Sequence, residues 1–157
     1  MSRDFLALLE KRRVLLFDGG MGTLLYGKGV YINRCFDELN LSSPDLVVEC
    51  HRGYVEAGCD VVETNTFGAN RVKLKGHGLE GSLEEINRKG AELARQAAGD
   101  NLFVAGSVGP LGIKIEPWGP TSTEEARELF AAQIAPPAAG GADPIFPQPF
   151  GVSHPIH

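Results

Sequence analysis

The pattern that most constrains the fold of this chain is a set of short apolar segments that lack the alternation of a half-exposed strand. Residues 14–17 (VLLF) and 102–105 (LFVA) are continuous apolar runs, and 60–65 (DVVETN) has two adjacent valines. A strand without alternation is buried on both faces, which is typical of parallel sheets covered by helices. We therefore expect three buried parallel strands at these positions.

Two helical patterns separate these strands. The segment 44–57 begins with proline and aspartate after a serine, which favours a helix start, and a glycine follows it. The segment 82–98 begins with Ser82 and Glu85 at the spacing of a capping box and is also followed by a glycine. Both segments are therefore expected to be helices that connect neighbouring strands.

Two further helices are expected at the ends of this pattern. A first helix is predicted over 2–12, and another is predicted to begin near Ser122, where Glu125 completes a second capping box. Strands and helices that alternate at this spacing form βαβ units with right-handed crossovers. The fold class is therefore α/β, with the strands parallel and adjacent in chain order, and all-α and all-β folds are excluded.

A faint internal repeat predicts a fourth strand. The segments that start at residues 57 (AGCD) and 140 (GGAD) correspond at an offset of 83 residues, and the Phe-Gly pairs at 67 and 150 correspond at the same offset. The second copy should therefore contain a strand followed by a loop, as the first copy does.

Proline limits what this fourth strand can be. Six of the ten prolines follow residue 135, and Pro144, Pro147 and Pro149 lie in the expected strand. Proline donates no backbone hydrogen bond, so the strand can be an edge strand at best, and Pro136-Pro137 should end the preceding helix. We divide the chain into the first half of a barrel domain at 1–135 and an atypical, extended or disordered tail at 136–157.

The ends of the three strands carry unusual polar segments: DGGMGT at 18–23, ETNTFGAN at 63–70 and GSVGP at 106–110. In parallel α/β folds, ligands bind at the carboxyl ends of the strands. Carboxylates there could accept hydrogen bonds from an ammonium group, and hydroxyls and glycine amides could donate to a carboxylate. The candidate binding residues for a small zwitterion are Asp18, Gly19, Gly20, Glu63, Thr64 and Ser107. The glycines alone could equally serve tight turns.

Several other function classes are unsupported. The segment 19–22 lacks the glycine spacing of a dinucleotide fingerprint, and we expect the next helix only some twenty residues later; a phosphate-binding loop motif is also absent. A net charge of −5 without a basic cluster argues against nucleic-acid binding. No apolar stretch is long enough to span a membrane and the N-terminus lacks a signal-peptide pattern, so we expect a cytoplasmic protein.

The three cysteines do not form a recognisable metal or disulfide pattern. Cys35, Cys50 and Cys59 are an odd number at irregular spacing. Cys50 falls in an expected helix and Cys59 just before an expected strand. We interpret them as reduced thiols, with Cys50 and Cys59 acting as small buried apolar residues.

Taken together, DGGMGT, FDELNLSSPDLV, AGCDVVETNTFGAN and GSVGP, in this order, resemble the homocysteine S-methyltransferase family. The similarity runs from about residue 14 to 119 and is strongest to the homocysteine-binding domain of cobalamin-dependent methionine synthases. The resemblance implies a (β/α)8 TIM-type barrel, of which this chain carries the first half: three to four βα units and an N-terminal helix. It also implies transfer of a methyl group to the homocysteine thiol, which forms methionine.

The resemblance also implies roles for individual residues. Asp18 and Gly19 would hold the amino-acid end of homocysteine, Thr64 would do likewise, and Asn65 would line the same pocket. At the end of the fourth strand, Gln148 stands where the family usually has a glutamate that binds the substrate amine, and this would weaken recognition of the ammonium group.

The family uses zinc to activate the homocysteine thiol. Its three cysteine ligands lie on later strands, at positions that this chain does not contain, so no metal role is assigned to any residue here. The resemblance leaves the methyl donor open, including methylcobalamin or methyltetrahydrofolate acting through other domains.

Other interpretations remain open. A non-catalytic half-barrel could bind a small amino acid or self-assemble, whereas an aldolase or phosphate-binding isomerase would need a lysine or a catalytic pair that the strand ends lack. An open sheet edge, with Val62 and Val104 partly uncovered, would favour a homo-oligomer.

Overall fold

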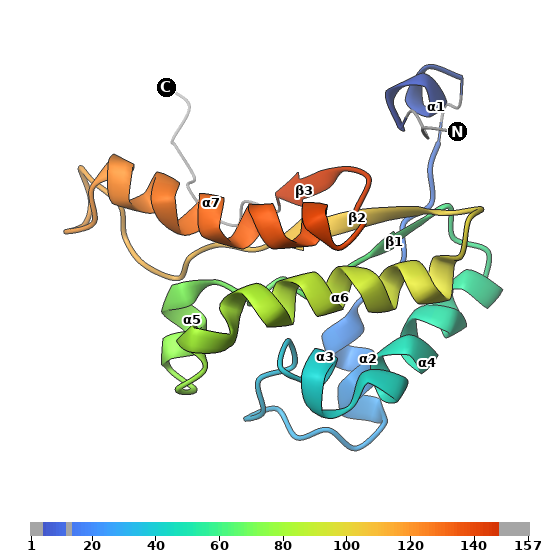
Figure 1. Cartoon of the computed structure of the whole chain (residues 1–157), viewed down its shortest axis with the longest axis horizontal. Helices are drawn as coiled ribbons and strands as arrows, with labels where there is room; N and C mark the ends of the chain where they lie inside the picture. Colours follow the sequence, from blue (N-terminus) through green and yellow to red (C-terminus); the bar gives the residue numbers. More distant parts are fainter. Residues whose placement is uncertain (1–4, 12–13, 148–157) are drawn as a thin grey trace.

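The computed structural model describes residues 5–11 and 14–147 of the chain. Four helices precede the first strand in this part of the chain, and strands and helices alternate from there on (Figure 1). In chain order the elements are α1 (Phe5–Lys11), α2 (Met21–Gly27), α3 (Leu39–Ser42), α4 (Pro44–Glu56), β1 (Val61–Glu63), α5 (Arg71–Lys75), the 3-10 turn η1 (Glu80–Ser82), α6 (Leu83–Ala98), β2 (Phe103–Val108), α7 (Thr123–Ala139) and β3 (Ile145–Pro147).

The three strands form a parallel sheet in the order β1-β2-β3. The segment 14–17 lies beside β1, because Phe17 forms a parallel bridge with Val61. The expectation of parallel segments that are adjacent in chain order is thus confirmed. The described residues form an α/β fold with a three-stranded parallel sheet, and a whole barrel is not present among them.

The prediction of a regular buried strand at 14–17 is wrong. Val14 is 76% exposed and Leu16 is 56% exposed. The Leu16 N–H donates to the side chain of Asp60, 3.1 Å from Oδ2, instead of to a backbone carbonyl. The described segment 14–17 therefore makes only one parallel bridge with β1, at Phe17.

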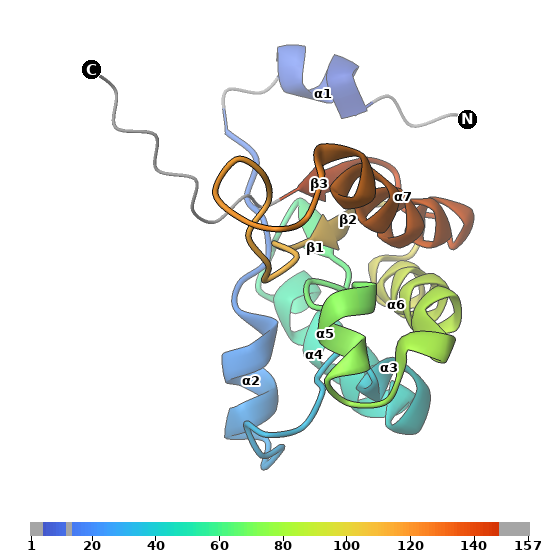
Figure 2. The ribbon, with the colours of Figure 1, turned by 90° about the vertical axis from the view of Figure 1, so that its left-hand side faces the viewer.

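Helices α4, α6 and α7 cover one side of the sheet, as Figure 2 shows. They pack against one another in this order, with α6 in the middle. Cys59, Val62 and Val104 form a buried cluster with Ala94 and Ala98 of α6. This cluster fixes the strands against the helices and thereby sets the positions of the strand ends.

The expectation that Val62 and Val104 are partly uncovered is therefore wrong, since both are 0% exposed. Side chains of a strand point alternately to the two faces of a sheet. These two valines occupy matching positions in β1 and β2, and both face α6. The helix therefore covers them, although the described strands do not close into a barrel.

The structure differs from the local sequence signals at two other places and agrees with them at a third. α2 begins at Met21, directly after the first glycine-rich turn, instead of some twenty residues later. Ser82 makes no side-chain cap to α6, because η1 brings the backbone into the helix before it. At Ser122 the predicted cap is present: its side chain accepts a hydrogen bond from the N–H of Glu125 at 3.1 Å.

Pro136 and Pro137 do not end α7, which continues to Ala139. Both prolines are buried, and a Cβ atom placed on Gly106 of β2 would lie 3.4 Å from Pro137 Cβ. Their carbonyls still accept hydrogen bonds from the N–H groups of Gly140 and Ala142. Packing against the sheet and these two bonds offset the missing proline donors, so the expected break was wrong.

The internal repeat is visible in the structure. Gly58 and Gly141 both have positive φ angles, 92° and 95°. Two residues later, Asp60 and Asp143 each accept a hydrogen bond from the backbone of the preceding segment, Leu16 N–H at 3.1 Å and Val104 N–H at 2.9 Å. The predicted fourth strand is β3, the last strand of the sheet. The predicted boundary at 135 falls inside α7, and the part of the tail from 148 lies outside the described residues.

Candidate functional site

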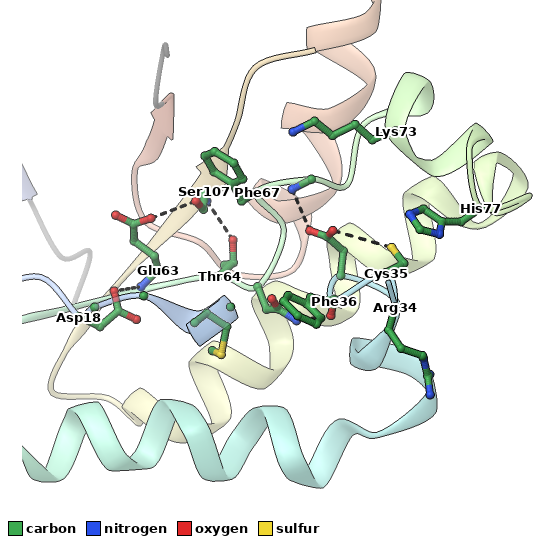
Figure 3. A pocket seen from close by; sticks show the side chains of 17 residues that line it. Asp18, Arg34, Cys35, Phe36, Glu63, Thr64, Phe67, Lys73, His77 and Ser107 are labelled. Atoms are coloured by element: carbon green, nitrogen blue, oxygen red, sulfur yellow. Dashed lines mark hydrogen bonds between the residues drawn. The ribbon is translucent and has the colours of Figure 1, made fainter. Parts of the chain in front are cut away.

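A cavity of about 630 Å³ lies where β1 and β2 end, beside the turn after residues 14–17 (Figure 3). Seven of the eight candidate residues line it: Asp18, Gly19, Gly20, Glu63, Thr64, Asn65 and Ser107. The eighth, Gln148, lies outside the described residues. The strand ends therefore bring together residues that are far apart in the sequence.

Asp18 and Glu63 form one end of this cavity, which we call the acidic end. The Asp18 Oδ1 atom accepts a hydrogen bond from the backbone N–H of Glu63 at 3.0 Å. Burial raises the pKa of Asp18 from 3.8 to about 7, and the charge of Glu63 adds to this, while the hydrogen bond from Glu63 N–H opposes it. Near neutral pH, Asp18 is therefore balanced between its neutral and charged forms.

Ser107 joins the acidic end from β2. Its Oγ donates to Glu63 Oε2 at 2.9 Å. Ser107 is 3% exposed, so this hydroxyl has little room to change partners. The bond fixes the direction of the Glu63 carboxylate at the cavity wall, where it can accept from a cationic group.

The Thr64 hydroxyl is engaged within the protein. Thr66 Oγ1 donates to the carbonyl of Ser107 at 2.8 Å, so its hydrogen is not available to Thr64. The Thr64 Oγ1 atom lies 2.6 Å from Thr66 Oγ1 and therefore donates to it, and it also accepts from Ser107 N–H at 2.9 Å. In this arrangement Thr64 ties β1 to β2, and its contact with a substrate stays a prediction.

The Asn65 side chain is engaged in a similar way. Its Nδ2 donates to the carbonyl of Phe36 at 2.8 Å and to Asn40 Oδ1 at 3.1 Å. Asn40 in turn donates to the carbonyls of Asn65 and Ile86. This network holds the segment around Phe36 against the end of β1, and it makes Asn65 a structural part of the cavity wall.

The far end of the cavity contains residues that our sequence reasoning did not assign to the site. They are Arg34, Cys35, Phe36, Asp37, Phe67, Lys73 and His77, several of which Figure 3 shows on the side opposite Asp18. Asp37 belongs to the FDELN segment that contributed to the family resemblance, so that motif was the available signal.

Asp37 fixes the loop after β1. Its Oδ1 accepts from Gly68 N–H at 2.9 Å, and Cys35 Sγ lies 3.8 Å from its Oδ2. Burial raises the pKa of Asp37, which the bond from Gly68 and the charge of Lys73 counteract. A Cβ atom on Gly68 would lie 2.7 Å from the Asp37 carboxylate, so a larger residue there would displace this carboxylate.

The described residues do not fit the zinc site that the family resemblance implies. Within residues 5–11 and 14–147, no three His, Cys, Asp or Glu side chains are grouped so that they could hold a metal ion. The three cysteines are free thiols on separate parts of the fold, with Cys50 and Cys59 buried as expected. We therefore derive no step that depends on a metal.

Comparison with known proteins identifies the family. The family model for homocysteine S-methyltransferase matches residues 15–148. The chain belongs to the homocysteine S-methyltransferase family. Two relatives are the methionine synthases of Mycobacterium tuberculosis, 34% identical over 154 residues, and Mycobacterium leprae, 32% identical over 154 residues. Each alignment covers 90% of this chain and 13% of the relative.

Solved structures of the family have the same fold. The homocysteine methyltransferase MmuM of Escherichia coli in its metallated form gives a TM-score of 0.78 at 27% identity, covering 90% of this chain and 56% of MmuM. Its oxidised form gives 0.76 at 28%, covering 89% and 54%. This chain thus spans about half the length of these structures and a much smaller share of the two methionine synthases.

No helix among the described residues is long and apolar enough to cross a membrane.

Proposed function

We propose that this chain binds L-homocysteine by its amino-acid end and serves a homocysteine S-methyltransferase of the methionine synthase type. The observation that carries the proposal is the acidic end of the cavity, where Asp18 and Glu63 lie together and Ser107 orients Glu63. Membership of the family supports the choice of homocysteine as the substrate.

The acidic end suits an ammonium group. Charge-assisted hydrogen bonds from an ammonium to carboxylates are about twice as strong as neutral ones. Glu63 is oriented by Ser107, and Asp18 lines the same end of the cavity, where the charge of Glu63 acts on it. Bound in this way, homocysteine would extend its thiol along the cavity toward the methyl donor.

The cavity is also larger than homocysteine needs. A volume of about 630 Å³ leaves room beside a small amino acid for a second reactant. In the proposed reaction the sulfur forms a bond to the methyl carbon, the bond between methyl and donor breaks, and the thiol proton is released. The donor stays open between methylcobalamin or methyltetrahydrofolate presented by other domains and a small methylated compound. The expected cytoplasmic location stays a prediction.

Calorimetric titration with L-homocysteine under reducing conditions tests the proposal. A matched ligand is 4-sulfanylbutanoate, which keeps the thiol and carboxylate but lacks the amine. We expect L-homocysteine to bind, the amine-free ligand not to bind, and Glu63→Gln to weaken homocysteine binding by about 10- to 100-fold, as for loss of a charged hydrogen bond. The exposed Glu124→Gln on α7 is the control. Equal binding of both ligands would refute recognition through the ammonium.

The second candidate is a half-barrel that binds homocysteine without turning it over. The observation that favours it is the lack of a metal-ligand group among the described residues. Methionine formation from homocysteine and a methyl donor, measured on the same protein, separates the two candidates. Binding without methionine formation would favour this second function.

A further inference from the structure

Tyr54 of α4 lies directly against the turn that carries Asp18, although it does not line the cavity. Its hydroxyl donates to the carbonyl of Gly20 at 3.3 Å. A Cβ atom placed on Gly19 would lie 3.1 Å from both Tyr54 Cε1 and its hydroxyl oxygen. The aromatic ring therefore occupies the space that a side chain at position 19 would need.

The Tyr54 ring is also held by the hydrophobic core. Tyr54 is half-buried and packs against the cluster of Cys59, Val62 and Val104 that joins β1 and β2 to the helices. The turn at 18–20 thus rests on a side chain that is held by the same core as the strands. A movement of the ring would change the position of the turn relative to β1.

The Asp18 carboxylate also influences the titration of Tyr54. Burial raises the pKa of Tyr54, and the Asp18 carboxylate raises it further. The phenol therefore keeps its proton well above neutral pH and remains a donor to Gly20. Asp18 also raises the pKa of Cys59, after burial, so these groups and Glu63 make up its titratable surroundings.

We infer that Tyr54 is a positioning residue of the acidic end: its ring and hydroxyl hold the turn at 18–20 so that the Asp18 carboxylate meets the backbone N–H of Glu63. This inference rests on the proposed function in so far as the acidic end binds homocysteine. Tyr54 itself does not touch the substrate. It acts through Asp18, whose hydrogen bond to Glu63 requires the turn to stay in place.

Two variants separate the hydroxyl from the ring. Tyr54→Phe removes only the bond to Gly20, and Tyr54→Leu removes the ring next to Gly19 while it still fills the apolar cluster. Tyr31→Phe and Tyr31→Leu are matched controls, since Tyr31 is 76% exposed and lies outside the cavity lining. The readouts are the pKa of Asp18 from carboxyl NMR titration of the whole chain, and the dissociation constant for L-homocysteine.

Tyr54→Phe should weaken homocysteine binding about two- to tenfold, as for loss of one neutral hydrogen bond, with little change in the Asp18 titration. Tyr54→Leu should admit water to Asp18, which lowers its pKa, and loosen the bond from Glu63 N–H, which raises it. Because desolvation is the larger of these two causes, the net change should be a fall of about one unit. The midpoint of the pH dependence of binding should move by the same amount. Neither Tyr31 variant should change either readout.

An unchanged Asp18 titration in a folded Tyr54→Leu variant would overturn the inference. So would unchanged homocysteine affinity in both Tyr54 variants. If the unmodified chain bound no homocysteine at any pH, the proposed function would fail, and the NMR titration would still decide whether Tyr54 positions Asp18.

Discussion

Homocysteine binding by this chain should be linked to the loss of a proton from Asp18. Its pKa is about 7 in the folded protein because the carboxyl is buried. The ammonium of homocysteine interacts favourably with the carboxylate and not with the neutral acid. The apparent affinity should therefore fall about tenfold for each pH unit below 7, since one pKa unit corresponds to a factor of ten.

The size of the effect follows from the fraction of charged Asp18. About one molecule in a hundred carries the carboxylate at pH 5, against about nine in ten at pH 8, for a pKa of about 7. The dissociation constant for homocysteine should thus be about 50 to 100 times larger at pH 5 than at pH 8, a difference in binding free energy of ~2.5 kcal/mol. Calorimetric titration at pH 5, 6, 7 and 8 measures this dependence directly.

Asp18→Asn should abolish the dependence and bind weakly at every pH, while the exposed Asp45→Asn on α4 should behave as the unmodified chain does. A flat profile for the unmodified chain would refute the linkage. A slope that persists in Asp18→Asn would assign the titration to another group.

The stability of the same variant provides a check that needs no ligand. The folded state raises the Asp18 pKa from 3.8 to about 7, so folding favours the neutral acid. The resulting loss of unfolding free energy is absent below about pH 4, increases from there to about pH 7 and is constant above it. Asp18→Asn should therefore be about as stable as the unmodified chain at pH 4 and more stable at pH 8, by up to ~4 kcal/mol in the unfolding free energy. Equal differences at the two pH values in urea denaturation would contradict this.

Three further predictions follow from other parts of the fold. His51 is 0% exposed, and burial lowers its pKa from 6.5 to about 4. Its contribution to the unfolding free energy should fall by ~1.4 kcal/mol per pH unit from about 6.5 down to 4, opposite in sign to the contribution of Asp18, so the unfolding free energy of the unmodified chain relative to His51→Leu should decrease by this amount per pH unit. Gly90→Ala should destabilise the chain by ~2 kcal/mol or more, because the new Cβ would lie 2.6 Å from Thr66 Cγ2 and 2.7 Å from Asn40 Nδ2. Gly53→Ala should instead stabilise the chain by ~1 kcal/mol, because Gly53 has open space around it in α4. Thermal unfolding of both variants tests this pair. The sheet edges, including the half-exposed Phe146 of β3, should promote self-association at micromolar concentration, and a single monomeric species in sedimentation would count against it.

Much of the architecture could be predicted from the sequence because it depends on local patterns. Continuous apolar runs indicate parallel strands. The helix predicted at 44–57 begins at Pro44 and is followed by Gly58 with positive φ, as its signals indicate, although the Ser43 side chain makes no cap. The 83-residue repeat places Asp60 and Asp143 at equivalent points, where each caps a neighbouring backbone N–H. The order of the strand ends also follows from chain connectivity, so the convergence of Asp18, Glu63 and Ser107 on one cavity could be expected.

Other features depend on contacts between residues that are distant in the sequence. Pro136 and Pro137 remain helical because they pack against β2, and Val62 and Val104 are covered because both face α6. Thr64 looks like a substrate donor in the sequence, but its hydroxyl is engaged with Thr66. Propensity and periodicity describe one segment at a time, so they do not specify these partners.

The chemistry of the site shows the same division. The sequence by itself determined that an aspartate follows the first apolar run and a glutamate ends the second strand. Only the tertiary structure decided that Asp18 titrates near pH 7, that Ser107 orients Glu63, and that Tyr54 supports the turn beneath them. The physical reason is that the pKa and orientation of a carboxyl group depend on its burial and its neighbours, and these exist only when separate parts of the chain have packed together.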